Sequence, residues 1–234
     1  MLQFEGVDST ILCVQLDRNI DDLENSILIN VEKLVSVFIH NAELHFVNRD
    51  GVICRIDGDH CTRLLRCSPL LLPVLSATVI EQRFMLISPK FLASFAIDFP
   101  LDYETYELNA ILTNGKIAKF GENRLIVFER KSQICWIWDA AKPSSPSHQL
   151  VFDGDENTVD LVCDNDNLYT LTNNGIISTW VLQENGRKYR GNLFNTGLLD
   201  CLQLLMAFPK KFVVQTVNAI HFLVFAPDEQ ATSG

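Results

Sequence analysis

The chain repeats one pattern every 40–44 residues, and this period constrains its fold more than any other feature. The stretch Leu44–Ile56 aligns without a gap with Leu168–Trp180. Each stretch reads as an extended run, a tight Asp-Gly or Asn-Gly turn, and a second extended run. Both turns suit the positive φ angles of a two-residue hairpin. The sequence therefore predicts the same β-hairpin at two distant places.

The hairpin pattern recurs six times along the chain. Its occurrences begin at Leu2, Leu44, Phe84, Leu125, Leu168 and Phe212, with spacings of 42, 40, 41, 43 and 44 residues. The predicted turns are Asp8-Ser9, Asp50-Gly51, Pro89-Lys90, Lys131-Ser132, Asn174-Gly175 and Asn218-Ala219. Such a regular recurrence indicates a repeat architecture built from one supersecondary unit.

Two further strands are expected in each unit. Short apolar strands precede five of the hairpins, at 34–39, 75–80, 116–120, 159–163 and 201–207. Outer strands are expected before those, at 26–30, 62–67, 104–108, 148–152 and 191–195. Four strands per unit at this period are typical of a β-propeller.

The predicted fold class is therefore all-β, a propeller of four-stranded antiparallel blades over residues 1–234 as one domain. A lone first hairpin plus five four-stranded units gives about five and a half blades. That number corresponds to part of a seven-bladed ring or to an imperfectly closed six-bladed ring, so the domain is expected to be incomplete. An open ring exposes sheet edges, which a partner strand can cover.

The unit 149–182 resembles a WD repeat. Its apolar positions, its Asn174-Gly175 turn and its closing Trp180 fall at the spacing of that family. The preceding unit ends in a literal Trp138-Asp139 pair. The Gly-His pair of the family is absent, because Asp155 follows Gly154. The resemblance implies a divergent propeller without the family's buried His–Asp–Trp network, held mainly by apolar packing between blades.

Composition excludes several classes of protein. Hydrophobic residues are 47% and charged residues 21%, which argues against disorder and against a coiled coil. The formal charge of −10 argues against a general nucleic-acid surface. No stretch reaches the roughly 20 apolar residues of a membrane helix, and the N-terminus does not read as a signal peptide. Seven cysteines, an odd number, most of which have apolar neighbours, together with the lack of an Asn-x-Ser/Thr site, indicate the cytosol or the nucleus.

No group of residues reads as a catalytic, cofactor or metal site. Cys54, His60, Cys61 and Cys67 lack the paired short spacing of a zinc site. The acidic stretch 153–157 departs from a calcium loop, because Thr158 stands where that loop needs glycine. His40 and His45 flank one turn and are expected at the surface. The prediction is a protein that is not an enzyme and holds no cofactor.

Three segments are candidate contacts. The acidic turn with Asp153, Asp155 and Glu156 is expected to line a propeller face. The cations Arg187, Lys188 and Arg190 form the one notable basic run. Ser145, which precedes Pro146 in a loop, is a candidate phosphorylation site.

The leading hypothesis is a non-catalytic scaffold that docks partner proteins within a cytosolic or nuclear complex. Its blades would hold loops and edges rigid, and its acidic character favours partners with basic segments. The alternative is a non-catalytic subunit that holds RNA for an RNA-modifying enzyme of the tRNA-methyltransferase type, through Arg187–Arg190. A second alternative is a truncated propeller without independent function.

Overall fold

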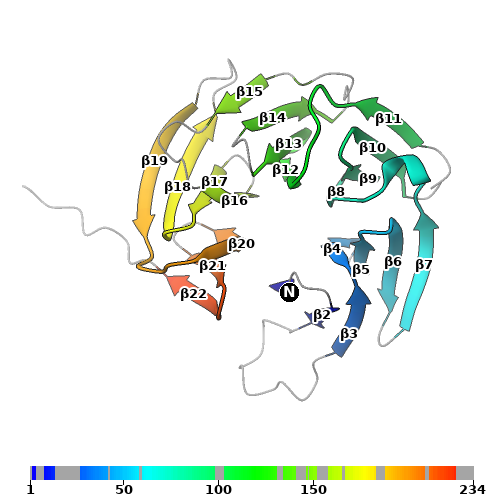
Figure 1. Cartoon of the computed structure of the whole chain (residues 1–234), viewed down its shortest axis with the longest axis horizontal. Coiled ribbons are helices and arrows are strands. Elements are labelled where there is room, and N and C mark those ends of the chain that lie inside the picture. Colours follow the sequence, from blue (N-terminus) through cyan, green and yellow to red (C-terminus); the bar gives the residue numbers. More distant parts are fainter. Residues whose placement is uncertain are drawn as a thin grey trace, which may run out of the picture. The chain divides into compact units, whose positions relative to one another are not determined.

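The structure is a computed structural model that describes residues 2–3, 8–13, 27–41, 43–57, 60–97, 103–130, 134–140, 146, 148–151, 158–164, 167–182, 188–208 and 211–224. Most of these residues lie in β-strands, labelled β1 to β22 in Figure 1. The helix within the described ranges is the short 3-10 turn η2 (Pro69–Leu71). Over the same ranges, no helix has the length and hydropathy needed to cross a membrane.

The described strands form antiparallel sheets in which strands adjacent in sequence are hydrogen-bonded neighbours. Sheet A contains β1 (Leu2–Gln3), β2 (Asp8–Cys13) and β3 (Ile27–Glu32). Sheet B contains β4 (Leu34–His40), β5 (Glu43–Asn48), β6 (Val52–Asp57) and β7 (His60–Arg66). Sheet C contains β8 (Ser76–Ile80), β9 (Arg83–Ile87), β10 (Phe91–Ala96) and β11 (Tyr103–Glu107). Sheet D contains β12 (Gly115–Phe120), β13 (Arg124–Glu129), β14 (Ile134–Asp139) and β15 (His148–Val151).

The last two sheets follow the same order. Sheet E contains β16 (Thr158–Asp164), β17 (Asn167–Thr172), β18 (Ile176–Leu182) and β19 (Lys188–Asn195). Sheet F contains β20 (Cys201–Phe208), β21 (Lys211–Thr216) and β22 (Ile220–Val224). The chain divides into two compact units, residues 1–149 and 150–234, with the boundary inside β15.

Within each unit, successive sheets pack face to face. In the first unit the inner strand β8 contacts both β4 and β12, and in the second unit β16 contacts β20. One core joins sheets B and C around Val47, Ile53 and Phe84. A second joins sheets C and D around Ile87 and Leu125, and a third joins sheets E and F.

Burial on both faces explains the continuous apolar runs of the central strands. The four residues Leu125, Ile126, Val127 and Phe128 of β13 are each 0% exposed. Successive side chains of a strand point to opposite faces, so a strand that alternated apolar and polar residues would bury polar groups here. The hydrophobic runs of the sequence are therefore the central strands of covered sheets.

Most of the predicted hairpins are confirmed. The turns Asp50-Gly51, Pro89-Lys90, Asn174-Gly175 and Asn218-Ala219 join strands that pair with each other. Lys131-Ser132 lies outside the described residues.

The first predicted turn is wrong. Asp8 and Ser9 lie within β2, where they pair with Glu32 and Val31 of β3. The hairpin itself exists, because β1 pairs with β2. Asp-Ser is a weak turn signal without glycine, and pairing along six residues of β3 outweighs it.

The predicted grouping of strands is wrong by one strand. Each outer strand pairs with the hairpin before it, as β7 pairs with β6 and β19 pairs with β18. The first hairpin is therefore joined by β3 rather than standing alone, and sheet F lacks an outer strand among the described residues. A short antiparallel return keeps the outer strand in its sheet, and the chain crosses to the next sheet only afterwards.

Candidate interaction surfaces

The hairpin turns and the crossover segments are bonded to each other, which makes one end of each sheet rigid. In sheets B, C and E the turn carbonyl accepts a hydrogen bond from the residue that follows the outer strand. These pairs are Cys67 N to Gly51 O (2.8 Å), Leu108 N to Lys90 O (2.7 Å) and Thr196 N to Gly175 O (3.0 Å). A second set of bonds holds the approach to the next inner strand. These are Val74 N to Arg49 O (3.0 Å), Leu112 N to Pro89 O (2.8 Å) and Cys201 N to Asn173 O (2.9 Å). Within each unit, we call the face formed by these turns and crossovers the loop-end face of that unit.

Hydrogen bonds to polar side chains stabilise the hairpin turns. A side-chain oxygen near the end of the first hairpin strand accepts a backbone N–H from across the turn. The pairs are Asn48 with Val52 (2.9 Å), Ser88 with Phe91 (3.1 Å), Thr172 with Ile176 (3.0 Å) and Thr216 with Ala219 (3.2 Å). Side-chain oxygens of these residue types stabilise turns in this way.

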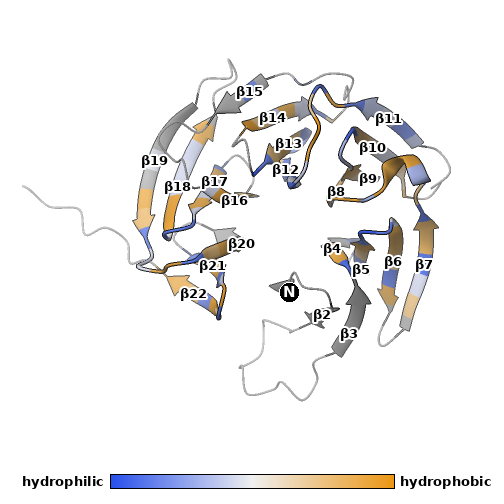
Figure 2. Cartoon of the chain, in the orientation of Figure 1, coloured by the Kyte–Doolittle hydropathy of each residue, from blue (hydrophilic) through white to orange (hydrophobic). Residues whose placement is uncertain are grey.

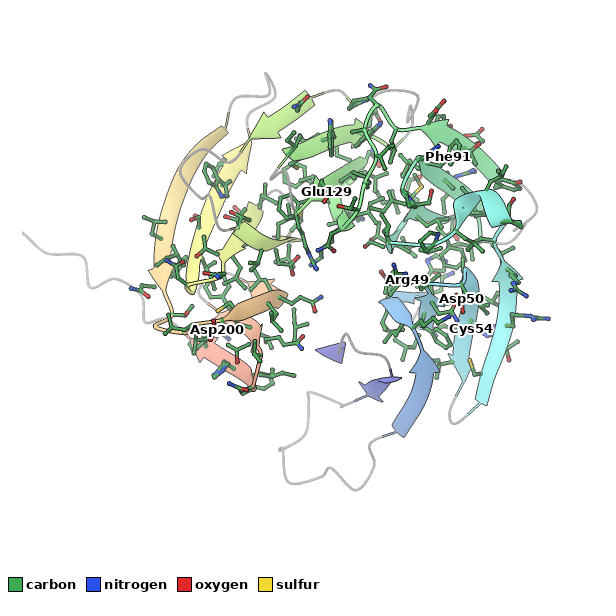
Figure 3. The ribbon with its side chains drawn as sticks, in the orientation of Figure 1. Arg49, Asp50, Cys54, Phe91, Glu129 and Asp200 are labelled. Carbon is green, nitrogen blue, oxygen red and sulfur yellow. The ribbon has the colours of Figure 1, made fainter. Side chains whose placement is uncertain are left out.

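Glu129 lies at the corresponding position of sheet D, where it bonds the crossover segment before β12. Its carboxylate is 5% exposed and accepts the backbone N–H groups of Thr113 (2.8 Å) and Asn114 (3.3 Å). Figure 3 labels Glu129 on β13. A buried carboxylate is tolerated when such donors satisfy it, so Glu129 fixes the segment that leads into β12.

The loop-end face of the first unit encloses a pocket of about 810 Å³. Its lining comes from the start of β4, the β5–β6 turn and the segments before β8 and β12. These residues are Lys33, Leu34, Val35, Arg49, Asp50, Pro73, Val74, Leu75, Thr113 and Asn114. We call this the loop-end pocket.

The charges of the loop-end pocket differ from the charge of the whole chain. Lys33 and Asp50 form an ion pair with an Nζ–Oδ2 distance of 3.1 Å, and both are about half exposed. Arg49 lies beside Asp50 in the turn (Figure 3) and is exposed. Two cations and one carboxylate leave a positive balance, so this pocket favours an acidic group of a partner.

A hydrogen bond from a buried polar residue of an inner strand joins neighbouring sheets within each unit. Ser36 is the third residue of β4, and its Oγ accepts the N–H of Ala77 on β8 (2.9 Å). Asp160 is the third residue of β16, and its Oδ2 accepts the N–H of Leu204 on β20 (2.9 Å). In both strands a register shift precedes this residue. The same position therefore carries the same inter-sheet bond in both units.

Gln203 occupies this position in β20 and has no such bond. A register shift also precedes it, and it is 9% exposed. Its Oε1 atom is buried without a hydrogen-bond partner, as is Oε1 of Gln215, which is its Cα partner on β21. An unsatisfied buried amide oxygen costs about 1–3 kcal/mol, so this face of sheet F lacks a donor.

The same face of sheet F carries exposed hydrophobic residues. Phe222 pairs with Val213 and Val224 pairs with Lys211, so they share the face of Gln215. Phe222 is 66% exposed and Val224 is 74% exposed. Figure 2 colours β22, to which both belong, by hydropathy. The opposite face, with Phe212 and Val214, packs against sheet E. We call the face that points away from sheet E the outer face of sheet F; it carries buried Gln203 and Val213, half-buried Gln215, and exposed Phe222 and Val224.

The corresponding face of sheet E is covered by sheet F. Tyr169 (3% exposed) and Leu171 (0% exposed) of sheet E lie in the core between the two sheets, at the positions of Val213 and Gln215. Val213 is also buried, so the exposed apolar area of sheet F is that of Phe222 and Val224. Exposed apolar area of this kind marks an interaction site more often than a scattered single residue does.

His45 is buried, and the prediction that it lies at the surface is wrong. It is 2% exposed, stacks on Phe38 at 5.8 Å between ring centroids, and lies 5.8 Å from Phe84. Burial lowers its pKa below the usual 6.5, against a smaller opposing effect of its bond to the Glu43 carbonyl. His45 occupies the position of Tyr169, and both rings are buried.

The cysteine cluster forms no metal site among the described residues. Cys54 is buried (Figure 3), and burial together with a hydrogen bond to Cys61 raises its pKa to about 12. Burial alone raises the pKa of Cys67 to about 11. Both thiols are therefore protonated at neutral pH and act as small core residues.

The predicted contact residues are mostly beyond the part that the structure describes. Ser145, Asp153, Asp155, Glu156 and Arg187 lie outside the described residues. The backbones of Lys188 and Arg190 belong to β19, opposite Leu182 and Trp180 of β18. These residues stay predictions.

The tryptophan of the WD-like unit has a local partner. Trp180 is 4% exposed and its Nε1–H donates to Oγ1 of Thr170, at 2.9 Å. This bond satisfies the indole in a repeat that lacks the Gly-His pair of the family. Trp138 is also buried, whereas the adjoining Asp139 is exposed.

Sequence reasoning missed the turn-locking residues and the inter-sheet residues. Residues 48, 88, 129, 172 and 216 recur at spacings of 40, 41, 43 and 44, which follow the hairpin period. A polar residue that recurs at the period of the apolar repeat could have indicated these positions from the sequence.

Comparisons with known proteins agree with this architecture. No protein-family profile matches the sequence, and a search of curated proteins found no match. The WD40 β-propeller domain of Doa1 is similar in structure, with a TM-score of 0.63, 10% identity, and coverage of 87% of this chain and 67% of that one. A streptogramin B lyase is similar with a TM-score of 0.62, 9% identity, and coverage of 95% and 77%. The N-terminal domain of Nup159 gives a TM-score of 0.52, 14% identity, and coverage of 78% and 52%.

At such identities these likenesses show the fold alone, which is the β-propeller fold of the Doa1 domain. The predicted fold class is confirmed at this level. A lyase is among the similar structures, so the fold by itself does not decide whether a protein is catalytic.

Proposed function

We propose that the chain is a non-catalytic interaction scaffold, acting as one propeller domain within a cytosolic or nuclear complex. The observation that carries this proposal is the outer face of sheet F, where buried Gln203 lacks a donor beside exposed Phe222. Fold similarity to the WD40 domain of Doa1 supports it. The occupant is an extended strand of a partner protein.

The inter-sheet bonds favour a strand as the occupant. At the two corresponding positions, Ser36 and Asp160 each accept a backbone N–H from the inner strand of the next sheet, at 2.9 Å. A partner strand that lies across Gln203 supplies the same donor. It also covers Phe222 and Val224 with its own apolar side chains.

The free edge of β22 offers a second attachment for the same partner. Among the described residues β22 pairs only with β21, whereas the corresponding strands β6, β10 and β18 each pair on both edges. An exposed edge presents unpaired N–H and C=O groups that an added strand can bond.

The size of the apolar contribution follows from exposure. A phenylalanine buries about 150–250 Å² when fully covered. Covering the exposed 66% of Phe222 therefore removes on the order of 130 Å² from water. At about 25 cal/mol per Å² this contributes about 3 kcal/mol, the size of an interface hot spot.

Affinity capture with matched variants tests the proposal. The intact chain, Phe222→Glu and the control Leu70→Glu are each used as bait, and bound proteins are quantified by mass spectrometry. Leu70 is 75% exposed on η2, so its substitution adds the same charge at an unrelated exposed apolar site.

A partner that the intact chain and Leu70→Glu retain and that Phe222→Glu loses supports the proposal. The purified partner must then show the same difference in a direct binding measurement. Equal binding by all three baits overturns the assignment to sheet F.

The remaining sequence-based hypotheses are part of this proposal or compete with it. The number of blades, about five and a half, is consistent with a sheet that a partner completes. An RNA-holding role through Arg187, Lys188 and Arg190 is the competing function, and a truncated chain without function is the third.

A further inference from the structure

A small apolar pocket in the first unit shares no lining residue with the loop-end pocket or with the outer face of sheet F. It lies where the end of β11 and the loop after it meet β13 and β14, and its volume is about 70 Å³. Its lining is predominantly hydrophobic and aromatic. The residues are Tyr106, Glu107, Leu108, Asn109, Ala110, Leu112, Val127, Trp136, Trp138 and Pro146.

Two tryptophans form one wall of the pocket. The ring centroids of Trp136 and Trp138 lie 6.5 Å apart with an interplanar angle of 50°. Trp138 is 4% exposed and Trp136 is half-buried. Within the part of the chain that the structure describes, neither indole N–H donates a hydrogen bond. Trp180, by contrast, donates to Thr170.

The polar groups of the pocket define the ligand further. Indole N–H groups and the amide of exposed Asn109 offer donors, whereas the one charged lining residue is the exposed Glu107. A polyproline segment presents backbone carbonyls and few N–H groups, and its pyrrolidine rings dock on aromatic surfaces. Glu107 favours a basic residue next to such a segment.

Pro146 of the chain itself lies in the wall of the pocket. A prolyl ring is therefore already accommodated beside these aromatic side chains. A volume of about 70 Å³ suits one more group of that size, not a nucleotide or a cofactor.

We propose that this pocket binds a prolyl residue of a proline-rich peptide that carries a basic residue beside it. The peptide belongs to a partner protein, and its site is independent of sheet F. The scaffold then has two recognition modes, strand addition in the second unit and proline recognition in the first.

Fluorine NMR on the intact chain tests the site. The chain has three tryptophans, all of which accept 5-fluorotryptophan labelling, and two of them line the pocket. The probe is a synthetic peptide with a Pro-x-x-Pro core and one flanking arginine. A second peptide, with alanine in place of each proline, is the control.

The expected result is that the resonances of Trp136 and Trp138 shift with the proline peptide while that of Trp180 stays. Trp180→Phe assigns the third resonance. No shift with peptide at about 1 mM, equal shifts of all three resonances, or equal shifts with the alanine peptide would each overturn the proposal.

A pair of variants on one strand adds an affinity measurement. Tyr106→Ala is expected to weaken peptide binding roughly tenfold, as removal of an aromatic anchor does. Tyr103→Ala is the matched control on β11, because Tyr103 is 44% exposed and stacks on Phe95 away from the pocket. Unchanged affinity of Tyr106→Ala contradicts the proposal. The Phe222→Glu experiment is unaffected by either outcome, so the two proposals fail separately.

Discussion

Replacing Gly175 with alanine tests how tightly the hairpin turn of sheet E is bonded to the crossover. Gly175 has φ +80°, a conformation that L-residues rarely adopt. A Cβ atom there would clash with the Leu198 carbonyl oxygen and with Thr196 Oγ1. One of these contacts is backbone, so the crossover itself has to move.

The expected loss is the sum of two effects. The left-handed conformation costs about 1 kcal/mol for alanine relative to glycine. Moving the crossover weakens the bonds Thr196 N to Gly175 O (3.0 Å) and Cys201 N to Asn173 O (2.9 Å). Each bond contributes about 1 kcal/mol net, so Gly175→Ala is expected to lose about 3 kcal/mol of unfolding free energy.

Two other glycines separate the effects. Gly197 has φ +71° with nothing within 4 Å of a Cβ, so Gly197→Ala is expected to cost about 1 kcal/mol. Gly51 has φ +74° and a Cβ there would meet Leu72 Cδ2 at 2.8 Å, a side chain that can yield. Its alanine variant is expected to lie between the other two.

Urea unfolding followed by circular dichroism measures all three variants. Equal losses for Gly175→Ala and Gly197→Ala would refute the close packing of turn and crossover, because only the conformational cost would then remain.

Three further predictions concern the inter-sheet bond, a buried histidine and the basic run. Asp160→Ala is expected to lower the unfolding free energy by about 3 kcal/mol, because it leaves the buried Leu204 N–H without this acceptor, and urea unfolding measures the loss. Burial lowers the pKa of His45 in the folded state. The stability of the fold that depends on neutral His45 is therefore present above about pH 6.5 and is lost as the pH falls through the lower folded pKa. Unfolding midpoints measured at pH 5 and pH 7 should differ less for His45→Phe than for the unsubstituted chain. Charge reversal of Arg187, Lys188 and Arg190 tests the RNA-holding function. If the chain holds RNA, this variant should lose RNA binding in a filter assay at fixed salt concentration, and unchanged RNA binding rejects that function.

The repeat made the fold class predictable because both of its signals are local. The Asp50-Gly51 and Asn174-Gly175 turns depend on backbone conformation that few other residues adopt, and the alternating runs around them pair in register. The grouping of strands into sheets was not predictable by the same route. Whether an outer strand pairs backwards or forwards depends on hydrogen bonds between chain segments, which the period does not record.

The interaction surfaces were less predictable than the fold. Gln203 is an ordinary polar residue in the sequence, and its meaning depends on the bonds that Ser36 and Asp160 make at corresponding positions. His45 read as a surface residue because it follows a turn, yet its strand position places it between two sheets. Burial between sheets is a property of tertiary packing, and a single histidine in a sequence carries no sign of it.

Hydrogen–deuterium exchange of the chain with and without its captured partner tests the central claim most directly. The account predicts slower exchange of backbone amides in β22 and β20 of sheet F when the partner is bound, since a partner strand bonds the free edge and covers the outer face. The amides of β9 and β13, which are already buried, should not change. Protection confined to the first unit, with β22 exchanging as fast as in the free chain, would contradict the account.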